Sequence, residues 1–340
     1  MQFVVRHFLL LMIKKYNKIL IVRFSSIGDI VLTSPVVRCV KKQLGSDVHF
    51  ITKAKFRPTI EHNPHIDKIY TIDKEVTEIL PKLKDEKYDL IIDLHKNLRS
   101  KRLILSLGVK SISFDKINIE KWLRVHTRLN FLPKTHLIDR YFESLESIGV
   151  TNDGQGLSYH HGLTEYDIAD LMPSDRYVAI VLGATYHTKR IPKEKLEIII
   201  QNSKLKCVLL GGNDVKEQAE ELKAKYPQVL NLCGQVSLNE SAALVLSSKY
   251  TITGDTGLMH IAAAFKTPTM VFWGSTAYEL GMYPYYGNKY DIPQVHMINK
   301  DINCSPCSKI GKDVCPKSHF KCMMDLSKED IIQGIRTLEK

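Results

Sequence analysis

The sequence predicts an α/β protein with two doubly wound, Rossmann-like domains that face a central cleft. Its 340 residues suit two domains of ordinary size. Short, β-branched apolar runs alternate with amphipathic segments, which is typical of parallel sheets covered by helices. The alternation lapses once, between about residues 118 and 166. A hydrophobic content of 44% and a charged content of 25% are those of a globular protein, and exclude disordered, collagen-like and repeat classes.

The first domain is expected over residues 18–172, after an N-terminal extension of residues 1–17. Arg6 and His7 interrupt the apolar stretch of the extension, which is shorter than the roughly 20 residues of a spanning helix. We therefore expect it to lie outside the fold, or translation to begin at Met12. An interfacial anchor is the alternative.

Four strands are expected in the first domain, each followed by a helical pattern. A helix is also expected to open at residue 136 and to end near Gly149. The predicted strands are residues 19–24, 48–52, 68–72 and 88–94.

The second domain is expected over residues 173–325, followed by a C-terminal helix over residues 326–340. It repeats the alternation of the first. The predicted strands are residues 177–183, 206–211, 229–232, 250–253 and 269–273. The predicted helices are residues 193–201, 214–225, 238–247 and 258–264.

The net charge of +11 lies in the first half of the chain. Residues 1–150 carry 27 basic and 16 acidic side chains, whereas residues 151–340 carry 21 of each. Nucleic acid, an anionic membrane or an acidic substrate could each explain a one-sided basic field, and simple solubility is the alternative.

Ligands of such folds bind at loops that follow strands, so three of these loops are candidates for the chemistry. The first is Ser25-Ser26-Ile27-Gly28-Asp29. Gly28 permits a tight turn, and Asp29 falls near a helix start, where the dipole favours a carboxylate anion. Asp29 is therefore a candidate general base, or it is simply a helix N-cap.

The second loop, residues 183–192, brings hydroxyl groups and a Lys-Arg pair between a strand and a helix. This composition predicts a site for a phosphorylated ligand, with Lys189 as a point charge. The alternative is a solvated basic loop. The chain contains neither a Walker motif nor a G-x-G-x-x-G fingerprint.

The third loop, residues 253–260, precedes a helix rich in small residues. Backbone amides of Thr256, Gly257 and Leu258 would form an anion cradle suited to a diphosphate. Asp255 could accept hydrogen bonds from sugar hydroxyls. His260, on the first turn, is either functional or a satisfied structural group.

Seven cysteines and no secretion signal indicate a reducing compartment. Three of them, Cys39, Cys207 and Cys233, lie in apolar patterns and are expected in the core. The remaining four could bind structural zinc or stay free thiols, and no catalytic metal is expected. These four are Cys304, Cys307, Cys315 and Cys322.

From about residue 18 to the C-terminus the chain resembles glycosyltransferase family 9, the lipopolysaccharide heptosyltransferases. The resemblance rests on residues 19–29, 188–192 and 254–260, supported by residues 92–100, residues 136–141 and the four-cysteine segment. The sequence departs from many relatives at Ile191, where they carry Trp before the proline.

The resemblance implies a GT-B fold with an N-terminal acceptor domain, a C-terminal nucleotide-sugar domain and a last helix that returns to the first domain. It implies inverting, metal-independent transfer of heptose from ADP-heptose to the lipid A-linked inner core, with no required cofactor. Asp29 would be the catalytic base, beside Ser25, Ser26 and Gly28 on the acceptor side. The other implied acceptor-side residues are Arg99, His136 and Arg140. The implied donor-site residues are Thr185, Lys189, Asp255, Thr256, Gly257, Leu258 and His260.

The implied partners are a nucleotide-sugar donor and an anionic glycolipid, which agrees with the basic first half. The implied location is the cytoplasm, peripherally at the inner membrane, and a monomer is expected. Three alternatives remain: a GT-B-like transferase for another nucleotide sugar, a sugar-nucleotide epimerase, and a basic nucleic-acid-binding protein. No recognition-helix, zinc-finger or RNP pattern supports the last of these.

Overall fold

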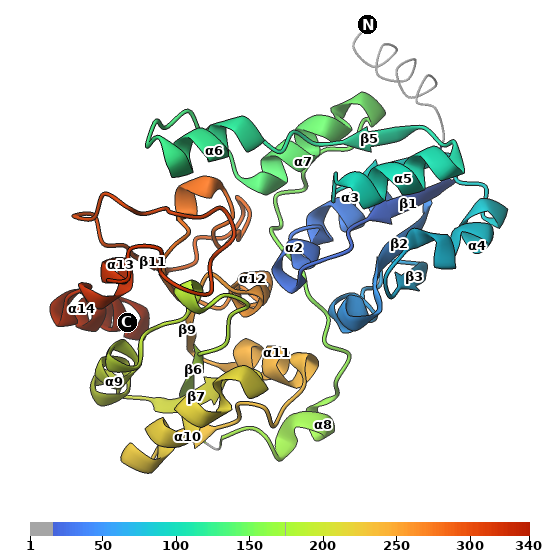
Figure 1. The fold of residues 1–340 in the computed structure, drawn as a ribbon. Helices are drawn as coiled ribbons and strands as arrows, with labels where there is room; N and C mark the ends of the chain where they lie inside the picture. Colours follow the sequence, from blue (N-terminus) through green and yellow to red (C-terminus); the bar gives the residue numbers. More distant parts are fainter. Residues whose placement is uncertain (1–15, 174) are drawn as a thin grey trace, which may run out of the picture. The chain divides into compact units, whose positions relative to one another are not determined.

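Parallel strands form two separate sheets in the computed structural model, which describes residues 16–173 and 175–340 (Figure 1). Most of the expected N-terminal extension therefore lies outside the described residues. The chain divides into two compact units. The first comprises residues up to Lys116 together with Thr135–Gly154, and the second comprises Ile117–Lys134 and Gln155–Lys340.

The first unit holds, within its described residues, a five-stranded parallel sheet in the order β3-β2-β1-β4-β5. Its strands are β1 (Lys18–Val22), β2 (Asp47–Lys53), β3 (Lys68–Ile72), β4 (Leu90–Asp93) and β5 (Ser111–Ser113). Its α-helices are α2 (Ile27–Val31), α3 (Ser34–Leu44), α4 (Leu80–Asp85), α5 (Leu98–Leu107) and α7 (Leu137–Leu145). Short 3₁₀ turns cover Ala54–Thr59, Val76–Glu78 and Glu146–Ile148.

The second unit holds, over the described part of the chain, a six-stranded sheet in the order β11-β10-β9-β6-β7-β8. Its strands are β6 (Tyr177–Val181), β7 (Lys206–Leu210), β8 (Leu230–Asn231), β9 (Tyr250–Gly254), β10 (Thr269–Phe272) and β11 (Gln294–Met297). Its α-helices are α6 (Asn118–His126), α8 (Glu165–Ala169), α9 (Lys193–Asn202), α10 (Lys216–Lys225), α11 (Leu238–Ser247), α12 (Gly257–Ala264), α13 (Lys321–Met324) and α14 (Lys328–Glu339). Short 3₁₀ turns cover His187–Lys189, Asn213–Val215 and Tyr278–Leu280.

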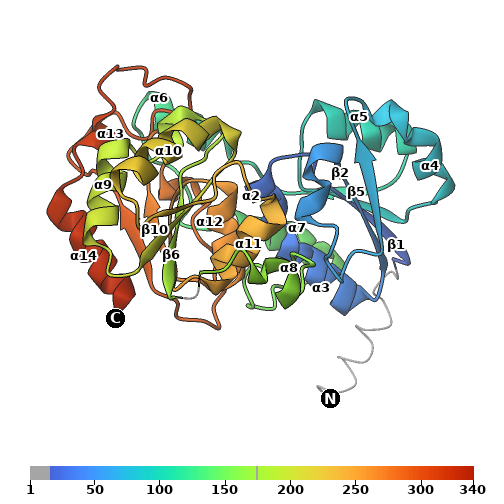
Figure 2. The same ribbon diagram turned by 90° about the horizontal axis from the view of Figure 1, so that it is seen from below.

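Helices cover both faces of the second sheet (Figure 2), and alternate residues of β6 contribute to the core on each face. Val178 and Ile180 pack with side chains of α9, α10 and α14, whereas Tyr177 and Ala179 pack with side chains of α11 and α12. This follows from the two-residue period of a strand. Burial on both faces explains why these strands are continuous apolar runs.

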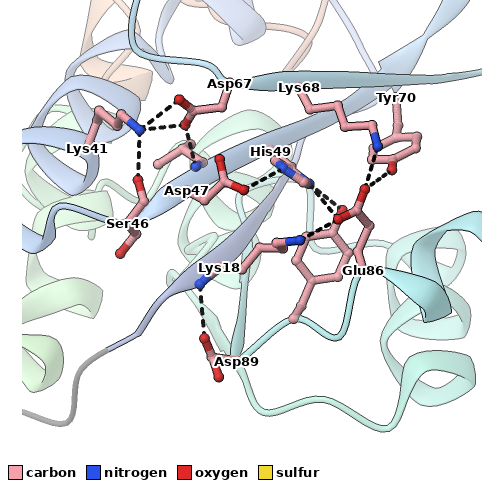
Figure 3. A network of polar contacts seen from close by, with 12 residues as sticks. Lys18, Lys41, Ser46, Asp47, His49, Asp67, Lys68, Tyr70, Glu86 and Asp89 are labelled. Carbon is pink, nitrogen blue, oxygen red and sulfur yellow. Dashed lines mark hydrogen bonds and ion pairs between the residues drawn. The ribbon is translucent and has the colours of Figure 1, made fainter.

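Charged side chains join the amino ends of the strands in the first unit (Figure 3). Glu86, at the end of α4, accepts hydrogen bonds from Lys18 (2.6 Å), Lys68 (2.5 Å) and Tyr70 (2.5 Å). Buried His49 bonds to the Tyr88 hydroxyl at 2.9 Å. This network links strands β1, β2 and β3 near their amino ends.

The last helix packs within the second unit. Gly334 of α14 lies against Met270 and Val295, where a Cβ would meet the Met270 methyl carbon at 2.9 Å. The return of this helix to the first domain stays a prediction.

Tyr16, in the expected N-terminal extension of residues 1–17, is buried, and Ser46 donates a hydrogen bond to its carbonyl oxygen.

Candidate active site

The loop after β1 fixes the Asp29 side chain at the carboxyl end of the first sheet. Ser26, and not Asp29, is the N-cap of α2, and Asp29 is its third helical residue. Asp29 Oδ2 accepts hydrogen bonds from the Ser26 amide (3.1 Å) and hydroxyl (2.9 Å). Ser25 is half-buried and Gly28 is buried beside them. Asp29 thus completes a capping box and keeps its other oxygen for a second partner.

That second partner is Arg23, a buried guanidinium directly after β1. Its Nη2 lies 2.6 Å from Asp29 Oδ1, and its Nε donates to the Ser25 carbonyl oxygen at 2.8 Å. Arg23 Nη1 also donates to the carbonyl oxygen of Leu94. Burial alone would raise the pKa of Asp29, but Arg23 and the Ser26 donors hold it below its ordinary value. Asp29 is therefore an oriented carboxylate at neutral pH.

The loop after β4 brings a neutral imidazole near this ion pair. Asp93 orders the loop by accepting hydrogen bonds from the His95 amide (2.9 Å), the Lys96 amide (2.8 Å) and the Ser100 hydroxyl (2.7 Å). The His95 ring lies edge-on to Phe24, and its Nδ1 is buried without a hydrogen-bond partner. Burial, with the positive charge of Arg23, lowers the pKa of His95 to about 3.

Arg99 belongs to the same neighbourhood, since its guanidinium carbon lies 5.9 Å from the centre of the Phe24 ring. Helix α7 supplies further groups. The Tyr141 hydroxyl lies 3.5 Å from Arg23 Nη1. Buried His136 is the N-cap of α7, and its Nδ1 accepts a hydrogen bond from the Ile138 amide at 3.2 Å. The ring of His136 therefore has a structural task.

Arg140 on α7 is a buried cation with spare hydrogen-bonding capacity. Only 3% of its surface is exposed. Its Nη1 donates to the Asp115 carbonyl oxygen at 3.0 Å, whereas Nε and Nη2 have no partner. Burial lowers the pKa of Arg140. Because unpaired buried donors are costly, this guanidinium is prepared to bind an anion.

Two glycines let the loop after β6 lie directly on the ends of β9 and β10. A Cβ on Gly254 would meet the Lys189 carbonyl oxygen at 2.0 Å, and one on Gly274 would meet that of Thr188 at 2.3 Å. The Thr188 hydroxyl lies 2.8 Å from the Ser275 hydroxyl and donates to the Lys312 carbonyl oxygen. Backbone contact therefore brings the second and third candidate loops together.

Lys189 and Asp255 form an ion pair where these loops meet, with Nζ 2.8 Å from Oδ2. Thr276 also donates to Asp255 Oδ2 at 2.8 Å. Thr256 is the N-cap of α12, and its hydroxyl accepts a hydrogen bond from the Met259 amide at 3.3 Å. The Gly257 and Leu258 amides lie in the first turn of α12, which leaves amides without intrahelical acceptors.

The other two predicted donor-site residues, Thr185 and His260, differ in their exposure to solvent. Thr185 is exposed in the loop, where a ligand could reach it. His260 is buried, with 2% of its surface exposed. Its side chain therefore belongs to the interior of the second unit.

Three cysteines are confirmed as core residues: Cys39, Cys207 and Cys233 are buried. The other four are free thiols. Burial alone would raise the pKa of Cys315, but the backbone amides of residues 317–320 lower it. Cys304 Sγ lies 3.8 Å from His319 Nε2. Over residues 16–173 and 175–340, no three His, Cys, Asp or Glu side chains are arranged to hold a metal ion. A structural zinc stays a prediction.

Comparison with known proteins decides the family. The model of glycosyltransferase family 9 (heptosyltransferase) matches residues 76–317. The chain belongs to glycosyltransferase family 9. It is therefore a glycosyltransferase, which favours this function over the epimerase and nucleic-acid-binding alternatives.

Curated relatives of this family 9 enzyme span nearly its whole length. Lipopolysaccharide heptosyltransferase 1 of Campylobacter coli is 24% identical, covering 94% of this chain and 98% of the relative. The enzyme of that name from Pseudomonas aeruginosa is 23% identical and covers 92% of each chain.

Solved structures confirm the predicted GT-B fold. A family 9 glycosyltransferase of Veillonella parvula matches with a TM-score of 0.73 at 20% identity, over 95% of this chain and 97% of that one. The ADP-heptose lipopolysaccharide heptosyltransferase II of Escherichia coli matches with a TM-score of 0.71 at 19% identity, over 94% and 98%.

Sequence reasoning missed the residues that surround Asp29 in this glycosyltransferase. No role was predicted for Arg23, His95, Lys116 or Tyr141. Arg23 carried the clearest signal, because a charged residue interrupts an otherwise apolar strand run. Lys116 gave no signal, since only the fold brings its charge near Arg23 and Asp93.

Proposed function

We propose that the enzyme transfers a heptose from ADP-heptose to a lipid A-linked inner-core acceptor of lipopolysaccharide, with inversion and without a catalytic metal. The observation that carries the proposal is the Asp29 carboxylate, held ionised and oriented by Arg23 and Ser26 at the carboxyl end of β1. The names of the Campylobacter and Pseudomonas relatives support the sugar and the pathway.

On the acceptor side, Asp29 would take the proton of the attacking hydroxyl. As the hydroxyl oxygen bonds to the anomeric carbon, the bond from that carbon to the diphosphate oxygen breaks on the opposite face. The configuration therefore inverts in a single displacement. A carboxylate with a lowered pKa is a weak base, so its proton transfer belongs late in the step, when the hydroxyl has become acidic.

On the donor side, Lys189 and the first-turn amides of α12 would stabilise the departing diphosphate. A cationic ammonium and a helix start both favour negative charge, and together they can carry charge that a metal ion would otherwise carry. Lys189 is held by Asp255, which in turn accepts a hydrogen bond from Thr276. A solved E. coli heptosyltransferase with ADP supports the choice of nucleotide.

Arg140 supports an anionic acceptor. Its two unpartnered N–H groups are buried, so a phosphate or carboxylate would recover hydrogen bonds that the free enzyme lacks. The basic excess of residues 1–150 would attract the same ligand over a longer range. We place the enzyme in the cytoplasm, peripherally at the inner membrane, as a monomer without nucleic-acid partners.

Two variants test the separate roles of the loops. Asp29→Asn is expected to lower transfer by about 10²–10⁴-fold, because it removes the base, while ADP affinity stays within a few-fold. Lys189→Ala is expected to weaken ADP binding by about tenfold or more, since it removes a charged donor. Transfer kinetics with ADP-heptose and calorimetry with ADP measure the two effects.

Matched controls are Asp73→Asn, exposed in the first unit, and Lys193→Ala, whose ammonium pairs with Glu221 on α10. Both are expected to behave as wild type. Retained turnover in Asp29→Asn would remove it as the base. Unchanged ADP affinity in Lys189→Ala would remove it from the donor site.

A further inference from the structure

Helix α6 exposes two large apolar side chains to solvent. Ile119 and Trp122 share one face of the helix and are 73% and 50% exposed. The opposite face carries half-buried Arg124. A surface helix ordinarily packs its apolar stripe on the protein and leaves its charges in water.

Polar contacts hold this orientation in place. Arg124 Nη2 lies 2.6 Å from Glu279 Oε1, and Asn130 donates to Glu279 Oε2 at 3.2 Å. Arg128 donates to the carbonyl oxygens of Pro306 (2.5 Å) and Cys304 (3.2 Å). In Figure 1, α6 accordingly lies beside the orange-red C-terminal segment. The apolar face is thus fixed outward by bonds on the inner face.

The exposed apolar surface continues beyond the helix. Leu129 and Phe131 are 53% and 63% exposed. Four large apolar side chains therefore gather within 13 residues of chain, which is unusual for a surface that faces only water. We call Ile119, Trp122, Leu129 and Phe131, together with Lys121 and Lys134, the α6 surface.

The charge of the segment selects the partner. Residues 117–134 contain four basic side chains and one acidic side chain, Glu120. Arg124 and Arg128 bond to the protein, and the other two basic residues are Lys121 and Lys134. Trp at an apolar face bordered by Lys and Arg is typical of helices that lie in the interface of an anionic bilayer. Over the described residues, no helix is long and apolar enough to cross a membrane. An interfacial contact is the mode that this surface fits.

We propose that the α6 surface docks the enzyme on an anionic lipid bilayer, with Ile119, Trp122, Leu129 and Phe131 entering the headgroup boundary and Lys121 and Lys134 contacting lipid phosphates. The proposal rests on the proposed function, because an acceptor linked to lipid A is presented at such a surface. It assigns the membrane contact to one segment of the chain.

Tryptophan fluorescence tests the contact directly. The chain has two tryptophans, and Trp273 is buried and donates to His296 at 3.0 Å. Vesicles of phosphatidylcholine with phosphatidylglycerol are therefore expected to shift the Trp122 emission to shorter wavelength. Vesicles of phosphatidylcholine alone are expected to give a smaller shift. Trp122→Phe is expected to abolish the shift and keep most of the binding.

Vesicle sedimentation of Ile119→Ser/Trp122→Ser measures the affinity, and we expect a loss of about tenfold or more. The matched control is Leu105→Ser on α5, a side chain that is 81% exposed elsewhere. It is expected to sediment as wild type. Phe131→Ser, in a loop, is expected to weaken binding as well and covers the case in which the double variant does not fold.

Transfer assays keep the two proposals apart. The double variant is expected to lose activity on lipid A-linked acceptor in vesicles and to keep wild-type activity on a deacylated, water-soluble acceptor. If wild type transfers heptose to neither acceptor, the proposed function is wrong. Vesicle sedimentation still tests whether the α6 surface binds the membrane. Equal sedimentation of wild type and double variant would overturn the docking proposal. So would a wild-type dimer that the double variant dissociates.

Discussion

At the scale of single residues, the negative charge of Asp29 is paired with the positive charge of Arg23 before any substrate binds. One carboxylate oxygen of Asp29 pairs with Arg23, and the other accepts a hydrogen bond from Ser26. Both oxygens are therefore bound to protein groups before the acceptor sugar binds. Arg23 in turn bonds to two carbonyl oxygens, which fix its plane. Arg23 is therefore a positioning residue that sets both the direction and the pKa of the Asp29 carboxyl, the proposed base.

Replacing Arg23 should change the pH dependence of the reaction. The ion pair lowers the pKa of Asp29, and without it burial raises that pKa. In Arg23→Gln we therefore expect the acidic limb of the kcat/KM profile to move to higher pH, with a smaller loss when each enzyme is compared at its optimum. Arg23→Lys should recover part of the shift.

A pH-rate profile of wild type and the two Arg23 variants measures this. Arg57→Gln, on an exposed turn of the first unit, serves as the control. A uniform loss of activity at every pH would mean that Arg23 acts on the fold alone and not through the Asp29 carboxyl.

Candidate site residues could be predicted from the sequence only where they lie in a recognisable motif. Asp29, Lys189 and Asp255 were named because they follow strands in polar, glycine-containing loops. His95 and Tyr141 were not, because a histidine or tyrosine beside apolar residues gives no local sign that the fold brings it near Arg23. The roles of the named residues stay predictions.

At the scale of elements, β-branched runs predicted the strands well. The expected strand at residues 68–72 and helix at residues 238–247 match the observed bounds. After β1, however, a single helix was expected where α2 and α3 are separate. Pro35 explains the division, since it lacks the amide that a continuous helix needs and starts α3 instead.

Strands β5 and β11 and helix α6 could not be predicted from the sequence. Strand β5 has three residues, two of them serines, and α6 exposes its apolar face. Strand β11 follows a long irregular segment and contains polar Gln294 and His296. In each case neighbours distant in sequence stabilise the element, and the local pattern does not.

The donor loop offers a test at this scale. In Gly254→Ala the new Cβ would lie 2.0 Å from the Lys189 carbonyl oxygen, so the loop must move and Lys189 moves with it. We expect ADP binding to weaken by about tenfold or more while far-UV circular dichroism stays that of wild type. Calorimetry with ADP measures the loss.

Gly45→Ala is the matched control, because its Cβ would meet nothing within 4 Å although its φ is +65°. It should cost stability alone, about 1 kcal/mol, through the left-handed backbone. Equal ADP affinity in wild type and Gly254→Ala would show that the loop position does not govern donor binding.

At the scale of the whole molecule, the amino and carboxyl ends of the strands in the first sheet carry different groups. The candidate chemistry lies at the carboxyl ends of the strands, and the network of Glu86, Lys18, Lys68 and His49 lies at their amino ends (Figure 3). Hydrogen bonds from Lys18 and Lys68 hold the pKa of Glu86 well below its usual range, and burial lowers that of His49.

Acid should therefore unfold this unit through two groups in turn. A depressed pKa in the folded state contributes stability above the unfolded value, and this is lost as pH falls through the folded value. His49 thus loses its contribution below about pH 6.5 and Glu86 below about pH 4.5. We expect Glu86→Gln to cost about 1–3 kcal/mol at pH 7, a difference that shrinks toward pH 3.

Urea denaturation at several pH values measures these losses, with exposed Glu75→Gln as the control. A stability difference between wild type and Glu86→Gln that stays constant from pH 7 to pH 3 would contradict the assigned cause. The network was not predicted from sequence, because its members come from four separated segments.

The backbone contacts of Gly254 and Gly274 have an evolutionary consequence. They hold the loop through its backbone, so its exposed side chains, Thr185 and His187, are less constrained than its buried ones. Lineages could in this way drift toward new donor preferences while inheriting the same scaffold.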